Sequence, residues 1–288
     1  MKNRLQKSIP GTLSSDESGK VCRAFDIIGD IAVIKVPKTT LPRVHDITER
    51  IMTTHRNVRT VLAQTSSVSG EFRLRPLMYL MGENKTSTVH REHGCLFSVD
   101  LANCYFSPRL SNERHRIACA VRPRETIVNM FAGVGCFSIM IAKNADPEKV
   151  YSIDLNPSAI LIMKENIRLN QVYDTVVPLQ GDSKEIAESK LQNVADRVLM
   201  PLPEKALEYL PIAISTLKAS GGWIHYYGFE HAKKNENPIE KTKIKVAERL
   251  SSLNTAFSFP FSRVIRTTGP NWHQVVLDIY IKRFSDKS

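Results

Sequence analysis

The stretch Asn129-Met-Phe-Ala-Gly133-Val-Gly135-Cys-Phe137 lies between two apolar runs of the chain. The first run, 126–130, predicts a buried strand, and the second, 135–143, predicts a helix. Gly133 and Gly135 permit a tight turn between them, because glycine adopts positive φ and has no Cβ to block a ligand. The exposed amides at the start of the helix could receive a carboxylate. The stretch therefore predicts a strand–turn–helix unit with a ligand site, although a plain tight turn is the simpler alternative.

Strands and helices alternate along the rest of the chain. Further strands are expected at 149–153, 175–179, 197–200 and 222–227, and further helices at 157–170 and 204–217. Such alternation is typical of a parallel, doubly wound sheet. The last two strand candidates, 262–267 and 275–282, lie too close together for a helix to fit between them, so they should pair antiparallel at the sheet edge. The predicted fold class is α/β, with a Rossmann-like, mostly parallel sheet that ends in an antiparallel pair.

The residues upstream of this region have a different pattern. Two strand-like runs meet at Gly29-Asp30 within 25–37, and a helix is expected at 42–54 with Val44, Ile47 and Ile51 on one face. More strands are expected at 58–63, 71–81 and 86–99. We therefore expect three parts: a flexible tail at 1–20, a small α+β domain at 21–102, and the Rossmann-like domain at 103–288.

Composition restricts the class of protein. The chain has 288 residues, 42% of them hydrophobic, and no apolar run approaches the ~20 residues that span a bilayer. The five cysteines have no CxxC spacing, which argues against a disulfide framework and a structural zinc site. We expect a cytoplasmic protein with no membrane partner and no metal. The formal net charge of +11 favours a polyanionic partner such as RNA or DNA.

The ends of the next two strands suggest which ligand the glycine loop binds. Asp154 ends one strand, where a carboxylate can accept from both ribose hydroxyls, and Asp182 follows the other, where it could accept from an adenine amino group. A dinucleotide site would need glycine where Ser138 stands, and no Gly-Lys-Ser/Thr phosphate loop is present. S-adenosylmethionine is the ligand that fits better.

Several segments together resemble one family. They are Tyr105-Phe-Ser-Pro-Arg-Leu-Ser-Asn-Glu113-Arg114, the glycine loop, Gly221-Gly-Trp-Ile-His-Tyr-Tyr227, Gly70-Glu-Phe-Arg73-Leu-Arg75 and Thr88-Val-His-Arg-Glu92-His-Gly94. They closely resemble the archaeal and eukaryotic tRNA (guanine-37 N1)-methyltransferases, which are class I enzymes. The resemblance runs from about residue 25 to the C-terminus. The Tyr-Phe-Ser-Pro-Arg-Leu stretch is shared with the related enzymes of wyosine synthesis.

The resemblance implies roles for individual residues. It makes Glu113 the general base that removes the N1 proton of guanine, and it assigns stabilisation of negative charge on O6 to Arg73. Without the resemblance, Glu113 would be a solvated charge on a helix at 110–121. The expected cofactor residues are Arg109, Phe131, Gly133, Gly135, Asp154, Leu155 and Asp182, and the expected substrate residues are Tyr105, Arg75, Ser107 and Pro108. The implied partner is the tRNA anticodon stem-loop, bound by a monomer.

Three features depart from the family pattern. Asn129 stands where the cofactor loop usually begins with Asp, and Pro201-Leu-Pro203 replaces an Asn-Leu/Pro-Pro motif. The chain also resembles a short form without the extra N-terminal domain that touches the tRNA elbow, so we expect the anticodon stem-loop to suffice as substrate.

Other functions remain open at this point. A wyosine-pathway enzyme could transfer an aminocarboxypropyl group, or methylate a wyosine intermediate, at the same tRNA position. A non-catalytic RNA-binding protein with a vestigial cofactor fold is favoured by Asn129 and Pro201. A methyltransferase for ribosomal RNA or protein also agrees with the charge.

Overall fold

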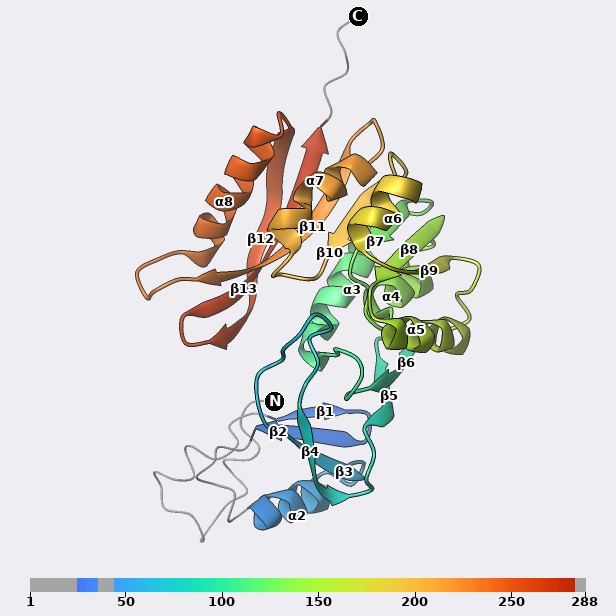
Figure 1. Ribbon diagram of the computed structural model, residues 1–288, viewed down its shortest axis with the longest axis vertical. Coiled ribbons are helices and arrows are strands. Elements are labelled where there is room, and N and C mark those ends of the chain that lie inside the picture. The colour runs from blue at the N-terminus through green and yellow to red at the C-terminus, as the bar shows by residue number, and fades with distance from the viewer. Residues whose placement is uncertain (1–24, 36–43, 283–288) are drawn as a thin grey trace, which may run out of the picture. The chain divides into compact units, whose positions relative to one another are not determined.

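The computed structural model describes residues 25–35 and 44–282 (Figure 1). The tail expected at 1–20 lies outside the described residues. The chain divides into two compact units, 1–108 and 109–288, here called the N-terminal and the C-terminal unit. The predicted boundary after residue 102 lies in the same segment, which follows strand β6 (Cys95–Asp100).

The N-terminal unit contains a mixed sheet in the order β1-β2-β3-β4. The strands are β1 (Asp26–Ile28), β2 (Ile31–Lys35), β3 (Thr60–Gln64) and β4 (Leu77–Gly82), and helix α2 (Val44–Thr54) lies between β2 and β3 in sequence. β1 and β2 form the expected hairpin around Gly29, whose φ is +56°. β2 and β3 are parallel, as a helical crossover allows, and β4 is antiparallel to β3.

The small core of this unit lies between α2 and the sheet. Ile51 is 1% exposed and belongs to a cluster with Ile34 and Val61, against which Val44 and Ile47 pack. The helix face predicted from the sequence is therefore confirmed. A second hairpin, β5 (Ser87–Glu92) with β6, turns at His93-Gly94 as expected.

The prediction of a strand at 71–81 is wrong for its first half. β4 begins only at Leu77, and the residues before it form a turn closed by a bridge between Ser69 and Leu74. Gly70 and Arg73 have φ of +73° and +54°, and the Arg73 amide donates to the Gly70 carbonyl at 3.1 Å. Two left-handed residues so close together bend the chain out of an extended conformation.

The C-terminal unit is built on a seven-stranded sheet in the order β12-β13-β11-β10-β7-β8-β9. The strands are β7 (Thr126–Asn129), β8 (Lys149–Asp154), β9 (Val176–Gln180), β10 (Arg197–Met200), β11 (Gly222–His231), β12 (Ala256–Gly269) and β13 (Trp272–Lys282). β7 to β11 are parallel to one another. β13 lies antiparallel between β11 and β12. The predicted Rossmann-like sheet with an antiparallel last pair is confirmed.

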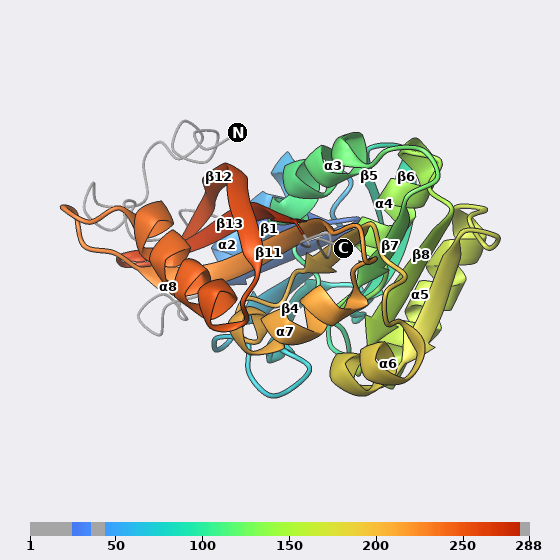
Figure 2. The same ribbon diagram turned by 90° about the horizontal axis from the view of Figure 1, so that it is seen from above.

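Helices cover both faces of this sheet. They are α3 (Ser111–Ala120), α4 (Cys136–Asn144), α5 (Pro157–Leu169), α6 (Ser183–Lys190), α7 (Ala206–Thr216) and α8 (Pro238–Ser252). α3 packs on α4 on one side, and α6 packs on α7 on the other (Figure 2). The helices α6 and α8 were not predicted from the sequence. The start of α8 does carry ordinary signals, because Asn237 caps the helix and Pro238 is its first residue.

Apolar side chains of the central strands form the main core. Val128, Val198 and Ile224 are fully buried in it, on three neighbouring strands. No helix of the described residues is long and apolar enough to cross a membrane. The described residues also contain no group of three or more His, Cys, Asp or Glu side chains that could hold a metal ion.

Candidate active site

The glycine loop connects β7 to α4 as the sequence predicted. Gly133 and Gly135 have φ of +56° and +89°. A Cβ on Gly135 would lie 2.8 Å from Met163 Cγ, so the loop needs glycine here for space as well as for conformation. The buried Asn166 side chain of α5 donates to the Val134 carbonyl at 3.0 Å and holds the loop in place.

Asp154 lies next to this loop at the end of β8. Its Oδ2 accepts from the Gly133 amide at 2.6 Å, and its Oδ1 accepts from the Asn156 amide at 2.9 Å. Burial raises the pKa of the Asp154 carboxyl, while the two amide hydrogen bonds oppose the rise. A carboxylate oxygen can accept more than one hydrogen bond, so the amides leave capacity for ribose hydroxyls.

Asp182 lies at the end of β9, the third strand of the series. Its Oδ1 caps α6 by accepting from the Lys184 amide at 2.7 Å, and its Oδ2 accepts from the Tyr209 hydroxyl at 2.8 Å. The Tyr209 ring also packs edge-on against Phe131, with 5.4 Å between centroids. Tyr209, on α7, thus contacts two of the expected cofactor residues, a position that the sequence did not predict. Leu155 is 38% exposed beside Asp154.

Asn129, the departure at the start of the loop, is fully buried beneath it. Its Nδ2 donates to Ser138 Oγ at 3.1 Å, and Ser152 Oγ donates to the same oxygen at 2.7 Å. A neutral amide avoids placing a charge in this interior, where an ionised carboxylate would be costly. Ser138 thus satisfies the amide nitrogen of Asn129, while Asn129 Oδ1 is buried with no hydrogen-bond partner among the described residues.

Glu113 is not a solvated charge, because it is 1% exposed within the C-terminal unit. Its Oε1 accepts from Arg116 Nη2 at 2.7 Å and from the Tyr227 hydroxyl at 2.9 Å. Its Oε2 accepts from Arg116 Nε at 3.0 Å and from Arg263. The Tyr227 ring lies 5.9 Å from that of Phe137, so Glu113 is linked by one residue to the helix that follows the glycine loop.

A row of buried polar groups extends from Glu113 across the sheet. Arg116 Nη1 donates to Asp278 at 2.6 Å, and Asp278 lies 2.6 Å from His225 Nδ1. Arg197 Nη1 lies 2.6 Å from His225 Nε2. Because Arg can only donate, Nε2 must accept, and the proton of the neutral ring stays on Nδ1. Burial lowers the pKa of His225.

Asp278 is the acidic member of this row. Burial acts to raise its pKa, but hydrogen bonds from His225 and Arg116 hold the pKa of Asp278 well below its usual range. The ionised Asp278 in turn keeps Arg116 in a fixed position between two carboxylates. None of these partners of Glu113 had been identified from the sequence.

The N-terminal unit carries the other expected chemistry. The Arg73 guanidinium lies 4.7 Å from the centre of the Tyr105 ring, and that of Arg75 lies 5.8 Å from it. Arg75 Nη2 also donates to the Phe106 carbonyl at 2.7 Å. Arg73, Arg75 and Tyr105 therefore form one cation–aromatic cluster. Ser107 next to it is buried, while Arg109, in the short 3-10 helix η3 (Pro108–Leu110), is exposed.

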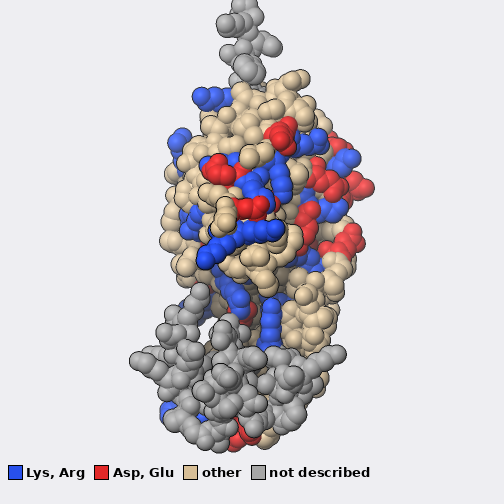
Figure 3. All heavy atoms as spheres, turned by 90° about the vertical axis from the view of Figure 1, so that its left-hand side faces the viewer, with Lys and Arg blue, Asp and Glu red and all other residues tan. Residues whose placement is uncertain are grey.

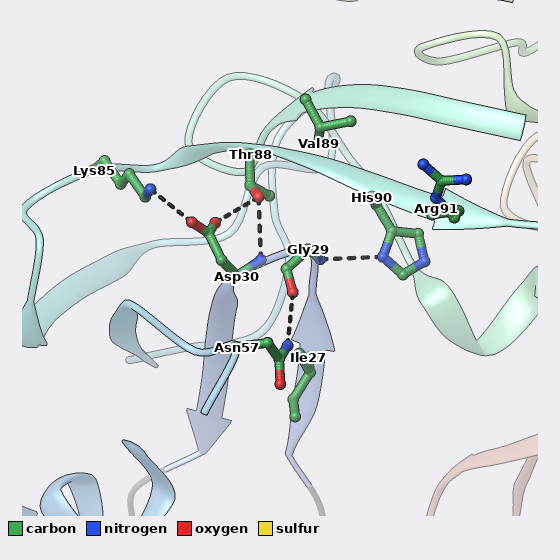
Figure 4. A pocket seen from close by; sticks show the side chains of 9 residues that line it. All are labelled: Ile27, Gly29, Asp30, Asn57, Lys85, Thr88, Val89, His90 and Arg91. Atoms are coloured by element: carbon green, nitrogen blue, oxygen red, sulfur yellow. Dashed lines mark hydrogen bonds and ion pairs between the residues drawn. The ribbon is translucent and has the colours of Figure 1, made fainter. Parts of the chain in front are cut away.

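A cavity of about 680 Å³ in the N-terminal unit lies beside the β1–β2 turn (Figure 4). Asp30 at its wall accepts from Lys85 at 2.8 Å and from Thr88 Oγ1 at 2.6 Å. The Gly29 amide donates to His90 Nδ1 at 3.1 Å, and Asn57 donates to the Gly29 carbonyl. These polar groups bind one another and fasten the turn to β5, so we assign the cavity no chemistry.

Many basic side chains of the C-terminal unit are paired. Lys241, Lys243 and Lys245 lie within 3.2, 3.0 and 2.7 Å of glutamate oxygens. In the face shown in Figure 3, blue and red side chains lie interspersed on the upper part of the molecule. The net positive charge of the chain is therefore not gathered there in a patch of one sign.

Two family models and several known proteins match this chain. The model of the TRM5/TYW2 methyltransferase domain matches residues 88–253, and that of the TYW2 N-terminal domain matches residues 5–86. The tRNA (guanine(37)-N(1))-methyltransferase Trm5b of Pyrococcus abyssi is 41% identical over 258 residues, which are 90% of this chain and 74% of that protein. Its crystal structure has a TM-score of 0.84 at 36% identity and covers 98% of this chain and 82% of that one.

One further relative is named for a wyosine nucleoside, and one further solved structure is of a TYW2 protein. The tRNA 4-demethylwyosine(37)-methyltransferase Taw21 of Saccharolobus solfataricus is 36% identical over 261 residues, which are 90% of this chain and 94% of that protein. The crystal structure of Pyrococcus horikoshii TYW2 in complex with MeSAdo has a TM-score of 0.77 at 27% identity and covers 99% of this chain and all of that one (100%).

Proposed function

The chain belongs to the TRM5/TYW2 methyltransferase family, and on that basis we propose that it transfers a methyl group to N1 of guanosine 37 in the tRNA anticodon loop. Membership alone supports S-adenosylmethionine-dependent modification of tRNA at position 37. The choice of N1 of guanosine rests on Glu113 and on the similarity to Trm5b.

The cofactor is S-adenosylmethionine, which supplies a methyl group on a positively charged sulfur. The three strand ends of the C-terminal unit fit it. Asp154 would accept from the ribose hydroxyls, Asp182 from the adenine amino group, and the amides after Gly133 would bind the carboxylate. Phe131 and Leu155 offer apolar surface for the adenine, and Arg109 a charge for the carboxylate or a phosphate.

The proposal rests on one observation, the burial and hydrogen bonding of Glu113. N1 of guanine holds a proton at neutral pH, so the nitrogen must lose it before it can attack a methyl group. A carboxylate that is buried yet held by ionic donors is kept oriented and dry, as a general base requires. We assign the removal of the N1 proton to Glu113 on these grounds.

Negative charge moves onto O6 when N1 loses its proton. A guanidinium can meet that charge with directed donors. We assign this role to Arg73, with Arg75 beside it and Tyr105 as the ring on which both lie. Ser107 and Pro108 complete the expected substrate surface. N1 lies on the Watson–Crick edge, so the target base must be unpaired, as in an anticodon loop.

A second candidate reaction is methylation of 4-demethylwyosine at the same position. The similarity to Taw21 spans 94% of that protein, which favours this candidate. The family asparagine is absent at Pro201-Leu-Pro203, so this position does not distinguish the two reactions. Transfer of an aminocarboxypropyl group is the further alternative.

Mass spectrometry of the product nucleosides distinguishes these reactions. The chain is incubated with methyl-labelled cofactor and with tRNA carrying guanosine, adenosine or 4-demethylwyosine at position 37. We expect 1-methylguanosine from the guanosine substrate and no product from the adenosine control. A methyl group found only on 4-demethylwyosine, or a gain of the larger aminocarboxypropyl mass, would contradict the proposal.

A further inference from the structure

Glu113 accepts more hydrogen bonds than a general base can retain. Both carboxylate oxygens receive donors, from Arg116 and Tyr227 on Oε1 and from Arg116 and Arg263 on Oε2. A substrate N–H must reach one of these oxygens before its proton can be removed. One donor therefore has to leave when the target base enters.

Arg116 and Tyr227 are fixed in place. The opposite edge of the Arg116 guanidinium donates to both oxygens of Asp278, at 2.6 and 3.0 Å, and Phe261 covers it at 4.4 Å. Tyr227 is 1% exposed and packs against Phe137. Moving either group would leave a buried charge or hydroxyl without its partner, which is costly.

Arg263 is held much less firmly. It lies on β12, the edge strand of the sheet, and its side chain is 40% exposed. Its Nε is buried with no hydrogen-bond partner in the described part of the chain. Its guanidinium is 6.0 Å from the Phe261 ring, at the outer limit of a cation–π contact. Among the donors to Glu113, Arg263 can leave at the lowest cost.

We propose that Arg263 is a positioning residue that occupies Oε2 of Glu113 until the N–H of the target base takes its place. In the free enzyme Arg263 holds the carboxylate in one orientation. In the complex its guanidinium turns to an oxygen of the RNA, and the base donates to Oε2. This inference rests on the proposed function, because it takes Glu113 as the base.

The proton balance of the step is simple. The N1–H bond breaks and an O–H bond forms on Oε2 of Glu113. The electron pair left on N1 forms the bond to the methyl group. The bond from that methyl group to the cofactor sulfur breaks, and its electron pair stays on the sulfur, which becomes neutral. Because Arg263 has already left Oε2, that oxygen is accessible to the proton of the base.

The pH profiles of Arg263→Met test the exchange. The profile of kcat/KM reports groups of the free enzyme, whereas that of kcat reports groups of the enzyme–substrate complex. Removing the cation should move the acid limb of kcat/KM to higher pH by about one unit. The acid limb of kcat should stay where it is in the wild type, since Arg263 no longer contacts Glu113 in the complex.

The matched control is Arg266→Met. Arg266 lies on the same strand and carries the same charge, but its Nε donates to Gln274 at 2.7 Å. In Arg266→Met the acid limbs of both kcat and kcat/KM should match those of the wild type. Arg263→Lys, which keeps the charge, should retain the wild-type kcat/KM profile. The other groups around Glu113, namely Arg116, Tyr227, Asp278 and His225, are the same in all variants.

Two results would overturn the exchange. One is an acid limb of kcat/KM in Arg263→Met that matches the wild type. The other is an equal shift of the kcat and kcat/KM limbs, which would mean that Arg263 stays on Glu113 in the complex. Cofactor binding by calorimetry verifies that each variant is folded. Failure of the proposed function is detected separately, because it appears as the wrong nucleoside product from the wild-type enzyme; the profiles are then measured on the position-37 nucleoside that it does modify.

Discussion

Two carboxylates of the C-terminal unit are held by different kinds of donor. Glu113 accepts from charged and hydroxyl side chains of α3, β11 and β12, whereas Asp154 accepts from two backbone amides. Charged donors stabilise an ionised carboxylate more strongly than neutral amides do. The charged donors hold Glu113 in one orientation, whereas the two amides of Asp154 leave acceptor capacity for hydroxyl groups.

Replacing Glu113 by Gln should abolish most of the activity. The amide keeps the shape of the side chain but cannot take up a proton at neutral pH. We expect single-turnover methyl transfer to fall at least ~100-fold with unchanged cofactor affinity in calorimetry. The control is Glu230→Gln, another buried glutamate, which pairs with Lys245 at 2.7 Å and should stay near the wild-type rate. A wild-type rate in Glu113→Gln would assign the base to another group.

Replacing Asp154 by Asn should instead weaken the binding of the cofactor. Loss of charged hydrogen bonds to the ribose is expected to raise the Kd for S-adenosylmethionine by roughly 10- to 100-fold. Since burial raises the pKa of Asp154, wild-type affinity should begin to fall on acidification at a pH above the usual range of aspartate.

The matched control for this variant is Asp196→Asn. Asp196 also accepts from a backbone amide, that of Thr126 at 2.8 Å, but at the start of β7 and away from the glycine loop. Its variant should bind the cofactor like the wild type. Equal affinity losses in both variants would indicate a general loss of structure and contradict the assignment of Asp154.

At the scale of elements, buried polar groups join the parallel part of the sheet to its antiparallel end. Arg197 on β10, His225 on β11 and Asp278 on β13 belong to three neighbouring strands. Asp278 then fixes Arg116 of α3, which holds Glu113. The order of the strands therefore contributes to the geometry of the candidate base.

The row of buried polar groups should make the free energy of unfolding depend on pH in a specific way. Burial depresses the pKa of His225 below its ordinary value of 6.5, so the unfolded chain binds more protons than the folded one below that pH. The free energy of unfolding should therefore fall as the pH drops from 7 to 5. The stability contributed by Asp278, whose pKa is also lowered, is lost only at more acidic pH.

His225→Gln tests this dependence by urea unfolding at pH 7 and pH 5. The amide offers one donor to Asp278 and one acceptor to Arg197, but it does not titrate in this range. The loss of stability on acidification should be smaller than in the wild type. His45→Gln, at an exposed position of α2, should leave the loss unchanged. An identical loss in His225→Gln would show that His225 does not cause it.

At the scale of the whole molecule, charge is the property that bears on RNA binding. The formal net charge is +11, yet lysines of α8 pair with glutamates, and Arg59 lies 3.6 Å from Glu83. Much of the positive charge is thus compensated locally. The remainder would contact phosphates without reading sequence.

Salt should therefore weaken the binding of tRNA and leave the binding of the cofactor nearly unchanged. Between 50 and 200 mM salt we expect the Kd for tRNA to rise by about tenfold or more, because binding cations to phosphates releases counterions. The Kd for S-adenosylmethionine should change far less, and calorimetry in the same buffers provides that comparison. A salt-independent Kd for tRNA would contradict electrostatic binding.

Local features of the protein follow from short stretches of its sequence. It predicted the β7–α4 glycine loop, the strand ends with Asp154 and Asp182, and the antiparallel last pair, because hydrophobic period and glycine conformation are properties of short segments. It failed at the turn before β4, where Gly70 and Arg73 bend the chain, and it missed α6 and α8.

The surroundings of Glu113, in contrast, arise only when the sheet is assembled. Its partners come from α3, β11 and β12, and Asp278 behind them comes from β13, more than a hundred residues further along the chain. No local pattern specifies which strands become neighbours in a sheet. The same helix charge would be solvated in isolation and is a buried, fully bonded carboxylate here, because folding removes it from water and supplies donors in exchange.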